Sequence, residues 1–261
     1  MGIIMKLTFK QFRILILVGI LIYVYVGQTL AEQKSRSWQD TLNVIIYPIN
    51  GDGSPQSQRT IDLLSIQQFL PIEQFLQQQK RYYGVRIARP VQIHIAPQIK
   101  KHPPSLPDLD SNVLSIMWWS LKMRWWAWYE NTYKGDKDIR LFVEYYNDET
   151  AHSHISVGLQ KGLLGLIKNY IGDEYIQRNN VIITHELLHT LGATDKYDAV
   201  TLMPIFPDGY AEPALGANSR QKKAEIMGGR IVYSKDIAIV PNSLDDCVIG
   251  EKTAKEIAWI M

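Results

Sequence analysis

Two histidines and a glutamate stand at a spacing that could bind and use a metal ion. The segment reads HELLHTLGATD and begins at His185. If residues 181–191 form a helix, His185 and His189 leave the same face one turn apart and can hold one small ion. Glu186 projects about a hundred degrees round the helix, where it can reach a water beside the ion. Glu186 is therefore the candidate general base.

The residues after the helix could supply a third ligand. Gly192 allows a sharp turn, and the reversed chain can return Asp195 to the histidines. Three protein ligands leave one position for water, which is typical of a catalytic zinc site. Asp198 could replace or orient Asp195, but the spacing favours Asp195. The full spacing arises by chance in on the order of one chain in tens of thousands, so an ordinary surface helix is the weaker interpretation.

Residues 185–195 resemble the extended zinc motif of the metzincin metalloproteases, H-E-x-x-H-x-x-G-x-x-(H/D), in the subset with Asp as third ligand, as in the snapalysin-like enzymes. The resemblance implies Zn²⁺ held by His185, His189 and Asp195, with Glu186 as general base. It also implies a metzincin-like α/β (α+β) fold. Such a fold has a mixed twisted sheet with a backing helix, a zinc-binding helix, and a small C-terminal lobe with a methionine turn and a closing helix.

The methionine turn has two candidates. Met227 is favoured because the paired glycines that follow it allow a chain reversal, as the resemblance requires. Met203 follows the motif too closely and precedes a proline that restricts the backbone. A two-helix arrangement with Glu212 or Glu225 as third ligand is the structural alternative, and the residues after the second histidine disfavour it.

The N-terminal stretch is apolar. Residues 14–30 contain no charged side chain and follow three cations, and their seventeen residues are at the short limit for crossing a bilayer. We therefore expect a membrane anchor or, less favoured, a cleaved secretory signal, with the body outside the cytoplasm. The predicted organisation is an N-terminal segment with linker over residues 1–36 and one catalytic domain over residues 37–261.

Charge and cysteine content exclude some functions. The net charge is +2, but three cations precede the first acidic residue, so the chain from residue 14 onward sums to −1. Nothing in that balance indicates a nucleic-acid partner. The single cysteine, Cys247, permits no intramolecular disulfide and is expected to be a small buried hydrophobe.

Periodicity predicts the remaining elements. A strand at 154–160 precedes the zinc helix, where metzincins have an edge strand that pairs with extended substrate. His152 and His154 share one face of it and are better explained as ordinary strand residues than as a second metal site. The other predicted elements are strands at 41–49, 90–96 and 139–146, a helix at 59–83 that Pro71 could interrupt, and a closing helix within 243–261.

The stretch 111–129 contains five of the seven tryptophans and predicts a helix that is apolar on two sides. One stripe contains Leu114, Met117, Leu121, Trp125 and Trp128, and the other contains Trp119, Met123 and Trp126. The favoured interpretation buries this helix between the sheet and a second element. The alternative places one tryptophan face in a lipid headgroup layer, with Lys122 and Arg124 near phosphates.

These patterns predict a zinc endopeptidase whose substrate is a peptide or protein. The alternatives are a zinc amidase acting on a cell-wall peptide and a non-catalytic binding module with the same fold. An intact Glu186 disfavours the binding module, because that carboxylate is not needed to hold metal. The residue that stabilises the oxyanion cannot be identified from the sequence, and Arg230, Tyr233 and Tyr210 are the candidates.

Overall fold

A five-stranded sheet forms the centre of the molecule in the computed structural model, which describes residues 8–107, 112–147, 156–159 and 162–261. The strands lie in the order β2-β1-β3-β5-β4, and all pairs are parallel except β4 with β5 at one edge. The strands span Leu42–Asn50 (β1), Val91–Ile95 (β2), Ile139–Tyr146 (β3), Val157–Leu159 (β4) and Leu164–Tyr170 (β5). The predicted mixed α/β sheet with helices is confirmed.

The central strands are buried on both faces because their apolar runs are continuous. In β1, Val44 and Ile46 point to one buried cluster, while Ile45 and Tyr47 point to the other. β3 divides its side chains in the same way. The predicted strands at 41–49 and 139–146 are confirmed, the second at both ends.

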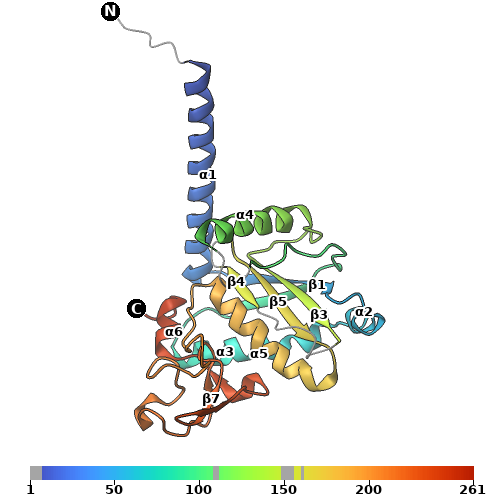
Figure 1. The fold of residues 1–261 in the computed structure, drawn as a ribbon. Helices are drawn as coiled ribbons and strands as arrows, with labels where there is room; N and C mark the ends of the chain where they lie inside the picture. Colours follow the sequence, from blue (N-terminus) through green and yellow to red (C-terminus); the bar gives the residue numbers. More distant parts are fainter. Residues whose placement is uncertain (1–7, 108–111, 148–155, 160–161) are drawn as a thin grey trace, which may run out of the picture.

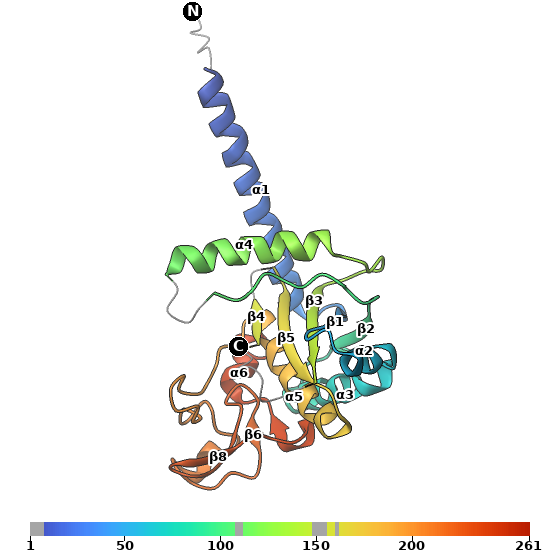
Figure 2. The same ribbon diagram turned by 45° about the vertical axis from the view of Figure 1, so that its right-hand side comes forward.

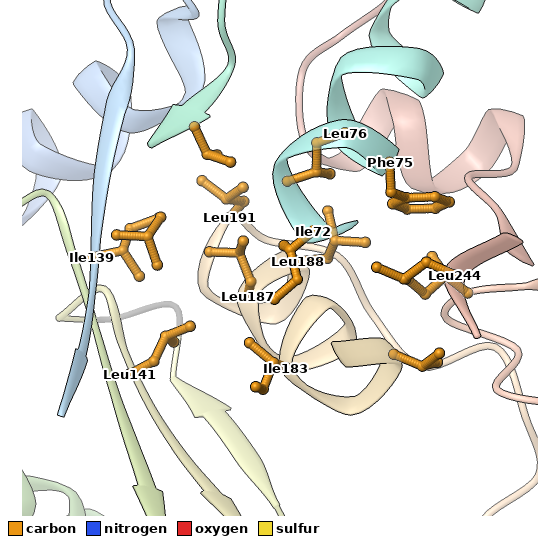
Figure 3. Packing of buried hydrophobic residues seen from close by; sticks show 14 of the residues in the cluster. Ile72, Phe75, Leu76, Ile139, Leu141, Ile183, Leu187, Leu188, Leu191 and Leu244 are labelled. Atoms are coloured by element: carbon orange, nitrogen blue, oxygen red, sulfur yellow. The ribbon is translucent and has the colours of Figure 1, made fainter. Parts of the chain in front are cut away.

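Two helices cover one face of the sheet, α3 (Leu70–Tyr82) and α5 (Asp173–Thr190). Figure 3 shows side chains from α3, α5 and the sheet meeting in one packed layer. Burying each large aliphatic side chain contributes about 1.5–3 kcal/mol, so this layer fixes α5 on the sheet. Its labelled members are Ile72, Phe75, Leu76, Ile139, Leu141, Ile183, Leu187, Leu188, Leu191 and Leu244.

One helix, α4 (Val113–Tyr129), covers the opposite face of the sheet (Figure 1). Its inner stripe of Trp119, Met123 and Trp126 belongs to the second buried cluster. The Trp126 ring packs edge-on against Phe142 of β3, with ring centroids 4.9 Å apart. The inner stripe is thus buried as the periodicity predicted. The favoured interpretation of a helix buried on both sides is wrong, because the residues of the other predicted stripe are exposed: Leu114, Met117, Leu121, Trp125 and Trp128.

The helix predicted over residues 59–83 is divided. The structure has α2 (Pro55–Asp62), a 3₁₀ turn (Ile66–Gln68) and α3. Pro71 does not interrupt a helix but occupies the first turn of α3, where its missing N–H would have no helical partner anyway. The periodic apolar residues continued across the break, so the pattern concealed it.

The N-terminal helix α1 (Phe9–Ser37) extends away from the body (Figures 1 and 2). Its last turns are attached to the body by the Lys34–Asp138 ion pair at 3.1 Å and by Arg36 Nη2, which donates to the Glu256 carbonyl at 2.6 Å. Residues 32–37, predicted as linker, are therefore helical.

No helix of the described residues is long and apolar enough to cross a membrane. The predicted localisation through a single N-terminal anchor over residues 14–30 is therefore wrong. The physical reason is length. An apolar run of seventeen residues rises about 26 Å as a helix, short of the roughly 30 Å hydrocarbon layer, and polar residues continue α1 beyond it.

The closing helix predicted within 243–261 is present but short, and the rest of the C-terminal part consists of other short elements. A 3₁₀ turn (Leu244–Asp246) leads to β9 (Cys247–Val248), which pairs with β6 (Ala224–Glu225), and α6 covers only Glu251–Glu256. A hairpin of β7 (Ile231–Ser234) and β8 (Ile237–Ile239) and a 3₁₀ turn (Pro213–Leu215) complete this part. Cys247 is buried as predicted.

The edge strand β4 contacts α5 at a position where only glycine fits. A Cβ on Gly158 would lie 2.5 Å from the Glu186 carbonyl oxygen and 2.5 Å from the His189 Cβ. Residues 154 and 155 of the predicted strand, together with His152, lie outside the described residues.

We expect Gly158→Ala to lower the free energy of unfolding by about 2 kcal/mol, because the added methyl must push β4 away from α5. Urea denaturation measures the change. Gly19→Ala is the control, since nothing lies within 4 Å of a Cβ there. A Gly158→Ala variant as stable as the control would show that β4 does not pack against α5 in solution.

Candidate metal centre

α5 presents His185 and His189 on the face opposite its buried leucines. The helix follows Gly172, whose φ of 120° is in the region that favours glycine, and has Asp173 and Glu174 in its first turn. Acidic residues there complement the helix dipole by about 0.3–1 kcal/mol each. The helix begins eight residues before the predicted residue 181, and it includes the whole H-E-x-x-H segment.

Three side chains converge at the C-terminal end of α5. The Nε2 atoms of His185 and His189 are 3.1 Å apart, and Asp195 Oδ1 is 3.1 Å from each of them. Gly192, with φ 102°, makes the turn that returns Asp195 to the histidines. One donor atom from each of the three residues lies within 4.8 Å of the other two. The residues chosen from the sequence thus come together in space.

Backbone carbonyls fix how the two imidazoles face. His185 Nδ1 lies 2.9 Å from the Ile226 carbonyl oxygen, and His189 Nδ1 lies 2.8 Å from that of Ala193. A carbonyl only accepts, so each Nδ1 must be the protonated nitrogen that donates. In the neutral rings both Nε2 lone pairs then point at each other and at the Asp195 carboxylate. Such a group of electron pairs repels itself unless a cation is shared between them, which is the arrangement a metal ion fits.

A proton can take part of that role. Burial lowers the pKa of His185, but the hydrogen bond to Asp195 and the negative charge of Glu186 outweigh it and raise the pKa to about 9. Burial opposes ionisation of Asp195 as well, yet the hydrogen bonds from the two histidines hold its pKa well below the usual range. The two shifts share one cause, which is the hydrogen bond between the His185 ring and the Asp195 carboxylate.

Glu186 is buried beside these residues. Its side chain is 5% exposed, and its Oε2 has no hydrogen-bond partner among the described residues. Burial raises the pKa of this carboxyl. A buried carboxylate oxygen without a partner is uncommon in folded proteins and indicates a place where something else binds. Glu186 is therefore a candidate functional group beside the three converging side chains.

Tyr197 is a site residue that the sequence analysis missed. Its ring lies 6.4 Å from that of His185, and its phenol is close enough to Asp195 for that carboxylate to affect its pKa. Burial, followed by the negative charge of Asp195, raises the Tyr197 pKa to about 12, so the phenol keeps its proton and can donate it in a hydrogen bond. The signal in the sequence that could have identified Tyr197 was its position two residues after Asp195.

The other candidates from the sequence have different contacts. The Tyr210 ring packs against Phe206, and the Arg220 guanidinium lies 4.6 Å from the centre of the Tyr233 ring. Asp198 Oδ1 accepts from the backbone N–H groups of residues 200 and 201, so it stabilises its own turn. Arg230 is half-buried. It is not among the described residues that hydrogen-bond to His185, His189 or Asp195.

The turn at residues 225–229 lies directly against the histidines. Its Ile226 carbonyl is the partner of His185, its Met227 is fully buried, and the Met227 carbonyl accepts from the Lys196 N–H at 2.9 Å. Met203 instead closes the loop that starts at Asp198, whose N–H donates to the Met203 carbonyl at 2.9 Å. Only the first turn touches the metal-binding residues, which agrees with the preference for Met227.

Glu212 and Glu225, the candidate third ligands of the two-helix alternative, accept hydrogen bonds from other residues. Glu225 accepts from the Gly228 N–H at 2.8 Å, the Gly250 N–H at 3.0 Å and the Thr253 hydroxyl at 2.7 Å. Glu212 Oε2 accepts from the Lys222 N–H at 2.9 Å. Glu225 therefore joins the turn at residues 225–229 to the C-terminal strand and helix, and Asp195 is the carboxylate that reaches the histidines.

Glu256 of α6 holds the loop that carries Asp195. Its carboxylate accepts from the Thr194 N–H at 3.0 Å and hydroxyl at 2.8 Å, and it pairs with Lys196 Nζ at 2.7 Å. Burial opposes ionisation of Glu256, but the Lys196 ammonium and the Thr194 donors lower its pKa overall. Both neighbours of Asp195 are thus fixed by one side chain from the end of the chain.

Comparisons with known proteins add little. No family model matches the chain, and no curated protein matches it. One solved structure to which the chain is similar is described as "Structure of a chaperone-substrate complex". It aligns with a TM-score of 0.41 and 13% identity over 84% of this chain and 33% of that chain. The chain thus spans about a third of that structure's length, and the similarity carries no functional argument.

We expect Glu256→Ala to lower the free energy of unfolding by about 3 kcal/mol, because it leaves the 4%-exposed Lys196 ammonium without its partner. Urea unfolding followed by circular dichroism measures the loss. Glu251→Ala in the same helix is the matched control. It removes an exposed ion pair with Lys255 and should change stability by less than about 0.5 kcal/mol. Equal losses in both variants would refute the role of Glu256.

Proposed function

We propose that the chain is a zinc-dependent peptidase of metzincin type that hydrolyses peptide bonds with Glu186 as general base. The observation that carries the proposal is the convergence of His185, His189 and Asp195 beside a buried carboxylate oxygen without a partner. Two imidazole nitrogens and one carboxylate oxygen suit zinc, and three protein ligands leave room for water or substrate. The motif resemblance and this geometry support the same site independently.

Glu186 and the metal would divide the chemistry between them. A bound zinc ion lowers the pKa of water to near neutrality and polarises a carbonyl. Glu186 takes a proton from the attacking water, and the water oxygen forms a bond to the carbonyl carbon. Glu186 then passes that proton to the leaving nitrogen as the C–N bond breaks, so the carboxylate is regenerated. Its raised pKa suits a group that both accepts and donates a proton.

Tyr197 is the best-placed donor for the carbonyl oxygen of the substrate. It keeps its proton because its pKa is raised, and it shares the pocket with Asp195 and His185. A hydroxyl that strengthens its hydrogen bond as negative charge develops on the oxygen lowers the barrier of amide hydrolysis. Tyr197 thus replaces the three donors considered from the sequence.

The edge strand β4 suits a substrate in extended conformation. It pairs with β5 on one side and with no other described strand on the second side. Gly158 brings β4 against Glu186 and His189, so a peptide that pairs with β4 would pass the metal-binding residues. This placement favours an endopeptidase acting on an unfolded segment of a peptide or protein.

Metal removal tests the proposal directly. We expect the purified full-length chain to contain about one zinc ion, to cleave an unfolded casein substrate, and to lose cleavage when zinc is removed by a chelator. Elemental analysis and a fluorescent casein assay make the measurements. Added zinc should restore activity. A protein that cleaves casein equally well without any bound metal would contradict the proposal.

Glu186→Ala separates chemistry from metal binding. We expect this variant to keep zinc and to lose kcat by at least about a hundredfold, because the carboxylate moves the proton but does not hold the ion. His189→Ala is the matched control and should lose both zinc and activity. Loss of zinc from the Glu186→Ala variant would instead make Glu186 a ligand.

Tyr197→Phe tests the carbonyl donor. Removing the hydroxyl should lower kcat by about a hundredfold while zinc content and KM stay nearly constant, since the interaction forms in the transition state. Tyr233→Phe is the control because its ring stacks with Arg220 away from the histidines. A Tyr197→Phe variant with unchanged kcat would remove this residue from the mechanism.

A further inference from the structure

The outer stripe of α4 is an exposed apolar surface on the face of the sheet opposite the metal centre. Its members are spaced by four, three, four and three positions, so they share one side of the helix. They belong to neither buried cluster. The outer stripe consists of Leu114 (75% exposed), Trp118 (61%), Leu121 (53%), Trp125 (66%) and Trp128 (70%). A contiguous patch of such side chains marks a binding surface.

Cations and aromatic rings alternate around this stripe. α4 contains Lys122 and Arg124 and no acidic residue. Lys122 Nζ lies 5.6 Å from the Trp118 ring centre, whereas Lys101 Nζ, 4.8 Å from the Tyr129 ring centre, already pairs with Glu130 at 2.9 Å. Tryptophan and tyrosine favour the boundary between hydrocarbon and water, and lysine beside them complements anionic headgroups. This composition fits a lipid surface better than an uncharged protein groove.

The neighbouring helix α1 indicates the same occupant. Its apolar part leaves the body beside α4, and α4 lies across its base in both views (Figures 1 and 2). Arg124 of α4 is close enough to Glu32 of α1 for their charges to interact. Five consecutive apolar residues of α1 are exposed, Ile14, Leu15, Ile16, Leu17 and Val18. These side chains add exposed apolar surface next to the outer stripe of α4.

We propose that the outer stripe of α4 docks on the surface of an anionic lipid bilayer. The tryptophan rings enter the boundary of the headgroup layer, and Lys122 faces the lipid phosphates. Docking is peripheral and requires no helix to cross the bilayer. It is also independent of the metal centre, since α4 and α5 lie on opposite faces of the sheet.

A fluorescent label on α4 reports docking separately from any contact made by α1. Leu121→Cys in the full chain is labelled with an environment-sensitive dye, while Cys247 stays unlabelled because it is 1% exposed. Vesicles of phosphatidylcholine with phosphatidylglycerol should shift the dye emission to the blue and protect it from iodide. Phosphatidylcholine alone should do so at a higher lipid concentration. The same dye at Lys235→Cys, in the turn between β7 and β8, is the control and should not respond.

A triple variant tests the stripe itself. Combining Trp118→Ser, Trp125→Ser and Trp128→Ser in the labelled chain should raise the lipid concentration for half-maximal shift at least roughly tenfold, with circular dichroism unchanged. The control changes exposed apolar residues elsewhere, Leu63→Ser, Tyr82→Ser and Val200→Ser, and should leave binding intact. Two results would overturn the proposal: a dye at residue 121 that stays in water with vesicles present, or a lipid-free dimer that the triple variant converts to monomer.

Discussion

The close approach of two imidazoles and one carboxylate at the candidate metal centre is the constraint that the rest of this structure serves. Two Nε2 atoms and one carboxylate oxygen are held 3.1 Å apart, an approach that is favourable when the three atoms share a cation, either a proton or a metal ion. The Ile226 and Ala193 carbonyls prevent either ring from rotating away, because each holds an Nδ1–H. Preorganisation of this kind would reduce the cost of binding a cation at this site.

Support for the three ligands comes from two separate parts of the chain. The buried leucines of α5 pack on the sheet and α3, which sets the position of both histidines. The short C-terminal elements set the orientation of the His185 ring and the position of Asp195. Glu225 fixes the turn whose carbonyl holds His185, and Glu256 fixes the loop of Asp195. Elements too short to form a core of their own thus contribute two carboxylates, the fully buried Glu225 and the partly buried Glu256, whose contacts form only when the rest of the fold is in place.

The sequence predicts the part of the candidate site whose residues lie close together in the chain. His185, Glu186, His189 and Asp195 lie within eleven positions, so helix periodicity and one glycine turn are enough to bring them together. The sequence does not predict the hydrogen bonds that hold the site in place from distant parts of the chain. Thr194 and Glu256 are 62 residues apart, and His185 and Ile226 are 41 apart, and no periodicity relates them. β5 was missed for a similar reason: LGLIKNY lacks alternation because both its faces are buried. The break between α2 and α3 was hidden by an apolar spacing that continued through it.

The helix α4 shows a further limit of periodicity. Two apolar stripes could be counted in the sequence, but only the sheet on one side, with Tyr47 and Phe142, provides a partner in the described structure. The inner stripe contributes to stability through burial, whereas the outer stripe contributes nothing to folding and leaves several large rings in water. Polar side chains at these positions would make the surface more soluble and would remove no packing against the sheet. Their presence on the same helix as two cations supports the proposal that this side of α4 docks on a surface outside the chain.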